Sequence, residues 1–288
     1  MAAIEGGMTL TRRDLGLGFA TTAVTALVMR SPADARFRHS FAWPNGARAA
    51  VSLTYDDGLD SQLANAVPDL NTYGFKATFF LTEENMDARL TDWQALEHAG
   101  HEMADHTVTH PCETLVNDSA ASFARNEIDP MEKYLDDNFT SPRPRSYAYS
   151  CGFTGLGRGP VATRKARYLS VLRPRLLAAR TVTGPPNDPR RLQEDRFHLN
   201  GYEPTYDHDD PRLAFVYVRQ AIRRGAWAIL IFHEILPARK GEGDTSQRSH
   251  RAILAWLAGQ PVWCAPMREV FEYATTSRDG AASSPKQG

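Results

Sequence analysis

Two adjacent aspartates, Asp56 and Asp57, follow an apolar, β-branched run and precede Gly58. Two negative charges at the end of a buried strand repel each other unless a cation or a hydrogen-bonding group lies beside them. A turn explains one of them, since Asp and Gly tolerate left-handed backbone conformations. A division of roles explains both: one carboxylate binds a metal ion and the other stays free as a general base.

Two histidines with a spacing of four, His106 and His110, lie in the stretch "HTVTHP". A pair at this spacing arises readily by chance among nine histidines, and two ordinary loop histidines are the simpler interpretation. The threonines, the valine and the proline around them disfavour a regular helix. A tight loop could still aim both rings at one ion, and with one of the two aspartates they would form a His-His-Asp set that suits a water-activating divalent metal. These ligand types allow zinc, which we take as the first candidate, and also cobalt, nickel or iron.

A further histidine, His233, ends the apolar run "AWAILIFH". It is either a histidine with a partner at the edge of the core or a general acid, because its ordinary pKa is near neutral. Four predicted strands thus end in reactive residue types: Asp56–Asp57, His106, Cys151 and His233. In parallel α/β folds the carboxyl ends of the strands form the ligand site, so we expect one shared site.

The elements that must position these residues alternate along the chain. Strands are expected at residues 48–55, 75–82, 101–106, 146–150, 226–233 and 261–266, and helices at 61–74, 91–100, 121–138, 211–225, 246–259 and 267–276. Thr91 and Gln94 are spaced as a capping box at the start of the second helix. Residues 153–212, rich in Gly, Pro and Arg, give no clear pattern. The alternation predicts a single-domain α/β fold with a mainly parallel sheet, open or closed into a barrel.

Composition narrows the function classes. The chain has 288 residues and a net charge of −1, so no basic field indicates nucleic acid. Three cysteines, Cys112, Cys151 and Cys264, allow at most one disulfide, and they suggest neither a disulfide scaffold nor a thiolate zinc site.

The N-terminus is typical of an export signal. Arg12 and Arg13 precede an apolar stretch from Leu15 to Met29, and Ala33-Asp34-Ala35 follows as a cleavage site. The paired arginines resemble a twin-arginine signal, which would make the export machinery a partner and leave no stable membrane span after cleavage. An N-terminal anchor helix is the alternative. We therefore expect a signal peptide over residues 1–35, a domain over 36–275 and a disordered tail over 276–288.

The ordered motifs resemble the polysaccharide deacetylases of carbohydrate esterase family 4, the NodB-homology domain, over about residues 45–275. "TYDDG", "HTVTH", "SYAYSCG" and "LIFH" correspond to its successive motifs. The resemblance implies a distorted (β/α)7 barrel and metal-dependent hydrolysis of N- or O-acetyl groups on carbohydrate. Carried over by position, the base is Asp56, the acid is His233, and the metal ligands are Asp57, His106 and His110. The same correspondence implies substrate contacts by Tyr149, by the backbone at Cys151 and by Leu230 beside the acetyl group.

The sequence also departs from the family pattern. Ala148 stands where many members have the arginine that orients the base, and Arg143 or Arg145 could substitute for it. The aspartate that normally supports the catalytic histidine is not evident, with Asp195 and Asp207 as candidates.

Three hypotheses follow. The first is an exported, periplasmic or extracellular deacetylase with an acetylated carbohydrate as substrate. The others are a hydrolase of a small non-sugar amide and a catalytically silent carbohydrate-binding domain. Trp43, Trp93, Tyr202 and Tyr206 could stack on sugars, although core packing is the commoner use of such residues.

Overall fold

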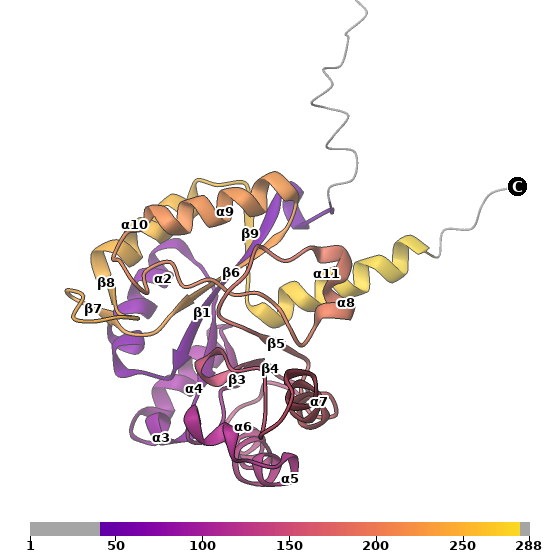
Figure 1. Ribbon diagram of the computed structural model, residues 1–288. Coiled ribbons are helices and arrows are strands. Elements are labelled where there is room, and N and C mark those ends of the chain that lie inside the picture. Colours follow the sequence, from indigo (N-terminus) through magenta and orange to yellow (C-terminus); the bar gives the residue numbers. More distant parts are fainter. Residues whose placement is uncertain (1–40, 283–288) are drawn as a thin grey trace, which may run out of the picture. The chain divides into compact units, whose positions relative to one another are not determined.

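Seven parallel strands form the main sheet of the computed structural model, which describes residues 41–282 (Figure 1). Their order is β5-β4-β3-β2-β1-β6, and β9 pairs with β1 as a branch. The strands are β1 (Ala49–Asp57), β2 (Thr78–Leu81), β3 (Glu102–Asp105), β4 (Ser146–Ala148), β5 (Ala178–Arg180), β6 (Trp227–Phe232) and β9 (Val262–Cys264). The predicted mainly parallel sheet is confirmed.

A short extended segment brings the two ends of this sheet together. Leu199 forms a parallel bridge with Arg180 of β5, and Tyr202 forms one with Leu230 of β6. The amide of Gly201 also donates to the carbonyl of Thr181, just after β5. Residues 199–202 therefore bridge the gap between β5 and β6, which makes the sheet a curled, distorted barrel, as expected.

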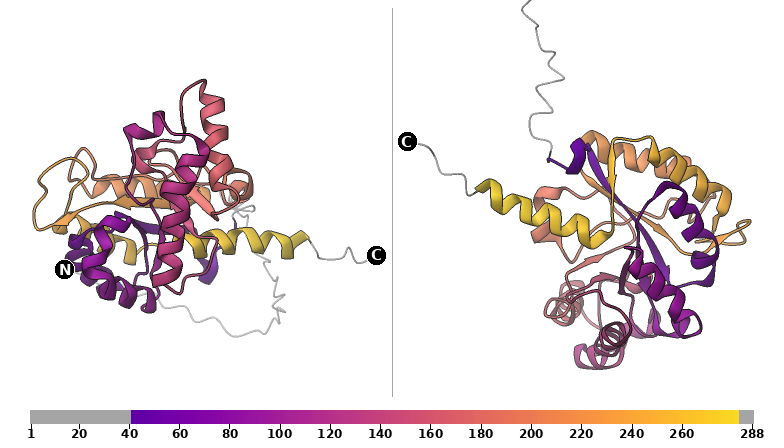
Figure 2. Two further views of the ribbon diagram at one scale, coloured as in Figure 1. Left: turned by 90° about the horizontal axis from the view of Figure 1, so that it is seen from below. Right: turned by 180° about the vertical axis from the view of Figure 1, so that it is seen from behind.

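Helices cover the outside of the curled sheet. α9 (Arg212–Arg224) and α10 (Gln247–Ala258) lie on one side, whereas α5 (Ala120–Phe123), α6 (Asp129–Asn138) and α7 (Val161–Leu172) lie on the opposite side (Figures 1 and 2). The remaining α-helices are α2 (Val67–Tyr73), α3 (Glu83–Met86), α4 (Leu90–His98), α8 (Leu192–Asp195) and α11 (Met267–Ala282). A small second sheet pairs β7 (Ile235–Leu236) with β8 (Thr245–Ser246).

Two parts of this helix pattern differ from the sequence-based expectation. Within residues 153–212, where the sequence shows no clear pattern, the structure contains the helix α7 and the strand β5. The expected capping box is wrong, because α4 begins at Leu90 and Gln94 donates its side-chain amide to the carbonyl of Asn138 instead. The side chain of Gln94 thus contacts the end of helix α6 and does not cap α4.

Alternation along β1 decides which residues enter the barrel. Val51, Leu53 and Tyr55 pack in the large cluster that includes the outer helices, while Ala50 packs with the opposite set. Since successive side chains of a strand point to opposite faces, Asp56 follows Ala50 on the inner face. Residues of five strands of the sheet share this cluster: Ala50, Phe80, Ala104, Ala148, Trp227 and Ile229.

The two ends of the chain were also assigned from the sequence. The predicted signal peptide over residues 1–35 lies outside the described residues. At the other end, α11 continues to Ala282, so residues 276–282 are helical rather than part of a disordered tail. The run that continues the helix contains no proline before Pro285, which allows the extension. Residues 283–288 lie outside the described part.

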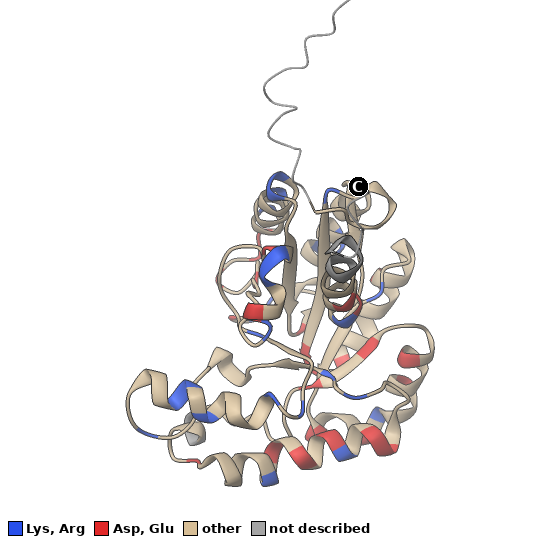
Figure 3. Ribbon diagram, turned by 90° about the vertical axis from the view of Figure 1, so that its right-hand side faces the viewer, with Lys and Arg blue, Asp and Glu red and all other residues tan. Residues whose placement is uncertain are grey.

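The charges on the described surface are of both signs, in keeping with the net charge of the whole chain (Figure 3). Helix α7 is locally different, because its charged residues are Arg164, Lys165 and Arg167. Within residues 41–282, no helix combines the length and the apolar character that crossing a membrane requires.

Candidate active site

The aspartate pair lies where β1 ends and the chain turns. Asp57 has a φ of 76° and Gly58 a φ of 68°, both in the left-handed region. The carbonyl of Asp57 accepts hydrogen bonds from Thr82 and Asn85, and that of Asp56 accepts one from Gln62. These bonds hold the turn. Asp57 thus occupies a position with turn chemistry, as the simpler interpretation expected, yet its side chain also takes part in the site.

His106 follows β3 directly and is fully enclosed. Its Nδ1 lies 3.0 Å from the carbonyl oxygen of Ala148 in β4, which directs Nε2 toward the carboxylates. Nε2 is 3.5 Å from Oδ1 of Asp57 and 3.7 Å from Oδ2 of Asp56. Burial lowers the pKa of His106 to about 4, although the two aspartates act in the opposite direction. The imidazole is therefore neutral at pH 7, the form that binds metals.

His110 lies in the tight loop that the sequence suggested. Thr107 and His110 have left-handed φ values of 72° and 50°, and the amide of His110 donates to Oγ1 of Thr107. Thr109 donates from both its amide and its hydroxyl to the carboxylate of Glu127. The loop is therefore held at several points, and Nε2 of His110 lies 3.7 Å from Oδ1 of Asp57.

The predicted metal ligands come together. One ligand atom each from Asp57, His106 and His110 lie within 4.8 Å of one another. Oδ1 of Asp57 and Nε2 of His106 are buried atoms with no hydrogen-bond partner within the described residues. Leaving such atoms unpaired costs about 1–3 kcal/mol each. A cation bound by these three side chains would satisfy both atoms, so the set fits a divalent metal.

The proposed base, Asp56, is only 2% exposed and forms an ion pair with Arg180 of β5. Burial alone would raise the pKa of Asp56, but the charge and hydrogen bond of Arg180, together with the charge of His233, outweigh it and lower the pKa. The carboxylate is thus held ionised beside the metal-ligand set. Its second oxygen lies 3.8 Å from Nε2 of His233.

The arginines suggested by the sequence for this role, Arg143 and Arg145, do not fill it. Arg143 and Arg145 pair with Glu132 and Asp136, away from the site. Arg180 reaches Asp56 because it ends β5 on the inner face of the barrel, where its guanidinium also stacks on Phe80 at 4.8 Å. The only signal in the sequence was the short apolar run "LLAA" before this arginine, within the stretch that gave no clear pattern.

The partner of His233 also differs from the two candidates. Nδ1 of His233 lies 2.8 Å from Oε1 of Glu203. Asp195 pairs instead with Arg191, and Asp207 lies along the cleft. Burial lowers the pKa of His233, but Glu203 and Asp56 more than compensate, so the pKa rises to about 9. His233 is therefore protonated at neutral pH, as a general acid must be.

An open cleft of about 520 Å³ lies over these groups. It is lined by Asp56, His106, His110, Tyr149, Cys151, Val182, Thr183, Tyr202, Glu203, Tyr206, Asp207 and His233. Of the predicted substrate contacts, Tyr149 and Cys151 thus line the cleft. Leu230 does not, contrary to the expectation: its side chain is fully buried in the cluster that contains Leu53 and Tyr55, on the face of the sheet opposite to Asp56.

The aromatic candidates separate in the same way. Trp43 and Trp93 are buried in the core at 3% and 0% exposure, which is the commoner use of such residues. Tyr202 and Tyr206 line the cleft, and Tyr206 is the more exposed of the two. Both come from the segment that closes the barrel and from the loop that follows it.

Two of the three cysteines form a disulfide. Cys112, two residues after His110, is bonded to Cys151, and Cys264 is free. This agrees with the limit of one disulfide set by the count. Its place beside the metal-ligand loop could not be deduced from spacing alone.

Comparisons with known proteins agree with the geometry. The sequence model of the family described as polysaccharide deacetylase matches residues 43–156, which include Asp56, Asp57, His106 and His110. A peptidoglycan-N-acetylglucosamine deacetylase of Bacillus cereus is 32% identical over 102 residues. These residues are 35% of this chain and 36% of the relative, so the chain spans about a third of that relative's length.

Two solved structures have the same fold. A candidate polysaccharide deacetylase from Mycobacterium smegmatis superposes with a TM-score of 0.59 at 16% identity, covering 86% of this chain and 96% of that one. A family 4 acetyl xylan esterase from Clostridium thermocellum, in complex with a cobalt ion, gives a TM-score of 0.53 at 15% identity, covering 77% and 90%. At these identities the likeness establishes the fold.

Proposed function

We propose that the chain is a metal-dependent hydrolase of the polysaccharide deacetylase family, which removes N- or O-linked acetyl groups from a carbohydrate. One observation carries the proposal: the ionised carboxylate of Asp56 lies between the neutral imidazole of His106 and the protonated imidazole of His233. A base, a neutral metal ligand and an acid thus meet at one place in the cleft.

Asp57, His106 and His110 would hold the metal. One carboxylate oxygen and two imidazoles leave coordination positions open, which is typical of a catalytic rather than a structural site. We propose Zn²⁺ as the natural ion, with Co²⁺, Ni²⁺ and Fe²⁺ compatible with the same donors. When bound, the ion supplies Lewis-acid polarisation of the acetyl carbonyl and lowers the pKa of a water.

Asp56 and His233 would divide the proton transfers. Asp56 accepts a proton from the attacking water, because Arg180 keeps its carboxylate ionised and directs its free oxygen toward the cleft. His233 donates a proton to the departing sugar amine or hydroxyl. Glu203, bonded to the opposite ring nitrogen, keeps His233 protonated until that step.

The walls of the cleft would bind the substrate. The backbone at Cys151, in the turn η6 (Ser150–Gly152), would stabilise the oxyanion of the tetrahedral intermediate. Tyr149 lines the cleft while its hydroxyl is engaged by the carbonyl of Phe197. Tyr202 and Tyr206 offer faces for sugar stacking.

We further propose that the protein is exported, with a twin-arginine signal over residues 1–35 and a catalytic domain over 36–275. The Cys112–Cys151 disulfide supports this, because disulfides persist mainly in oxidising compartments. The proposed site is then periplasmic or extracellular, where acetylated polysaccharides are accessible.

Acetate release from a panel of N- and O-acetylated glycans tests the function. Wild type should release acetate, and a chelator or Asp56→Asn should abolish release. Acetate release that survives both treatments would refute the mechanism. Binding of glycan without release would support a silent binding domain, and release from a small amide alone would support an amide hydrolase.

A further inference from the structure

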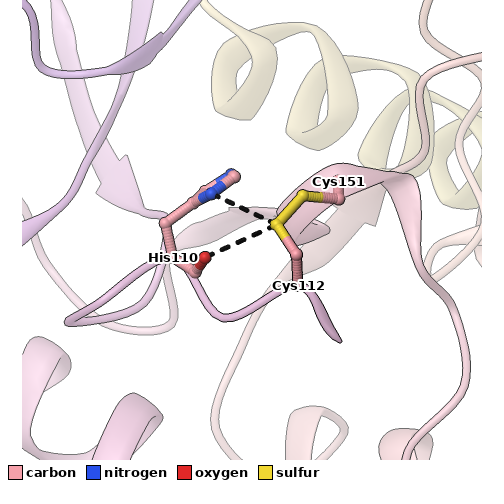
Figure 4. A group of neighbouring side chains, drawn as sticks. All are labelled: His110, Cys112 and Cys151. Carbon is pink, nitrogen blue, oxygen red and sulfur yellow. Dashed lines mark hydrogen bonds between the residues drawn. A yellow bond between two sulfur atoms is a disulfide. The ribbon is translucent and has the colours of Figure 1, made fainter. Parts of the chain in front are cut away.

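The disulfide joins the two loops that surround the metal-ligand set. Cys112 lies in the loop after β3, two residues beyond His110, and Cys151 lies in the turn η6 directly after β4 (Figure 4). The bond joins residues 39 positions apart in the sequence, and the two Cα atoms are 5.7 Å apart. No step of the proposed reaction uses either sulfur.

The sulfur of Cys112 contacts the side of His110 that faces away from the site. Nδ1 of His110 lies 3.7 Å from Sγ of Cys112, within hydrogen-bonding reach of sulfur (Figure 4). Nε2, on the opposite side of the ring, faces Asp57. When Nε2 binds a metal, Nδ1 carries the proton, and the only acceptor recorded for it within the described residues is this sulfur.

The second imidazole of the set is held in a comparable way. Nδ1 of His106 lies 3.0 Å from the carbonyl oxygen of Ala148 in β4. A metal-ligating histidine almost always donates its other ring N–H to such a partner, which fixes the orientation of the ring. The sulfur of Cys112 occupies this position for His110.

The disulfide also ties that sulfur to β4. Cys151 is three residues beyond Ala148, so both imidazoles are positioned from the end of one strand, His106 by a carbonyl and His110 by a disulfide. The backbone of the His110 loop has separate supports in Thr107 and Glu127. The disulfide therefore adds control over the ring of His110 rather than over the course of the loop.

We propose that Cys112 and Cys151 are positioning residues whose disulfide sets the affinity of the Asp57–His106–His110 site for its metal, so that reduction weakens metal binding. This inference rests on the metal site of the proposed function. Reduction by a phosphine is balanced: phosphine, water and the disulfide yield phosphine oxide and two thiols, with two electrons passing from phosphorus to sulfur. Afterwards Cys112 is free of β4, and its S–H can turn to the carbonyl oxygen of His110, 3.6 Å away.

Titration of the metal-free protein with Co²⁺ tests the proposal directly. Oxidised wild type is compared with protein reduced on an immobilised phosphine, which is removed before titration under anoxic conditions. We expect reduction to weaken Co²⁺ binding by about tenfold to a hundredfold, the usual effect of losing such a partner. Circular dichroism of the same samples should remain native, because Thr107 and Glu127 still hold the loop.

Two variants separate the roles of the sulfurs. The double variant Cys112→Ala, Cys151→Ala should bind Co²⁺ as weakly as reduced wild type, and phosphine should not change its affinity. Because this variant retains the free Cys264, it also shows whether that thiol contributes to Co²⁺ binding. Cys151→Ala alone keeps the sulfur beside His110 but releases it from β4. It should match the reduced protein, because the link is what positions the sulfur.

Several outcomes would overturn the proposal. These are equal Co²⁺ affinity in oxidised and reduced protein, unfolding on reduction, or tighter binding after reduction with an intense sulfur-to-cobalt charge-transfer band. The last would mean that His110, Cys112 and Cys151, whose ligand atoms also lie within 4.8 Å, form a thiolate site. The proposed function fails separately: oxidised protein would then bind Co²⁺ in a redox-dependent manner yet release no acetate.

Discussion

Replacing Glu203 by glutamine tests the assignment of His233 as the general acid. Oε1 of Glu203 lies 2.8 Å from Nδ1 of His233, and this carboxylate contributes to raising the pKa of His233 to about 9. Glutamine keeps the size of the side chain and an acceptor oxygen but removes the charge. The substitution therefore isolates the electrostatic contribution from the packing.

The expected shift follows from the type of hydrogen bond. A bond to a charged group contributes about 1.5–3 kcal/mol and a neutral one about 0.5–1.5 kcal/mol, a difference of about 1–1.5 kcal/mol. Since one pKa unit corresponds to about 1.4 kcal/mol, the pKa of His233 should fall by about one unit. The attraction of Asp56 remains, so the pKa should not return fully to its ordinary value.

The sign of the effect on rate is defined. His233 acts in its protonated form, so activity falls as the pH rises through the pKa of about 9. In Glu203→Gln that alkaline limb should move to lower pH by about one unit. The assay is acetate release against pH from 6 to about 10.5. This span is set by the pKa of about 9 and covers the alkaline limb of wild type and that of the variant.

A neighbouring carboxylate provides the control. Asp207 lines the same cleft, but Glu203 is the partner of His233, so Asp207→Asn should leave the alkaline limb in place. An unchanged limb in Glu203→Gln, with acetate release retained, would mean that another group donates the proton. Equal shifts in both variants would mean that the general charge of the cleft matters rather than the bond.

Three further predictions concern the supports of the site. In metal-free protein, the raised pKa of His233 should stabilise the fold by about 3 kcal/mol below pH 6.5, and this contribution should be lost as the pH rises to about 9, as measured by denaturant unfolding. Arg180→Met should shift the acid limb of kcat/KM to higher pH, because burial then raises the pKa of Asp56. The same variant should lower the free energy of unfolding by about 3 kcal/mol, since a buried ion pair loses one partner. An unshifted acid limb would exclude Arg180 as the group that holds Asp56 ionised. Replacing Cys112 and Cys151 by alanine should cost about 4 kcal/mol for a bond between residues 39 positions apart, or about 10 °C in Tm by calorimetry; an unchanged Tm would show that the bond does not constrain the unfolded chain.

Part of this site is readable from the sequence because it follows local rules. Asp56, Asp57, His106 and His233 each come directly at the end of an apolar strand, and parallel strands bring such ends to one edge of a sheet. The types of these residues then suggest metal binding and proton transfer. The mainly parallel sheet follows from the alternation of strands and helices, whereas its closure into a distorted barrel was implied by the family resemblance.

The remaining part depends on tertiary contacts that have no local signature. Arg180 ends a strand of three residues, which is too short to show any periodicity. Glu203 follows residues 199–202, which close the barrel through isolated β-bridges and do not form a regular strand. Each reaches its partner, Asp56 or His233, across a long sequence separation of 124 or 30 residues. The pairing of Cys112 with Cys151 is of the same kind, because the count of cysteines limits the number of bonds without choosing the partners.

The most direct test of the account is a comparison of Asp56→Asn with Asp57→Asn, two nearly isosteric changes in adjacent residues. Each protein is titrated with Co²⁺ and then assayed for acetate release. We predict that Asp56→Asn still binds the metal and loses activity by about a hundredfold or more, as expected for a lost general base. Asp57→Asn should lose both metal binding and activity, since it removes one of three ligands. Metal binding lost in Asp56→Asn and retained in Asp57→Asn would contradict the proposed division of roles between the two aspartates.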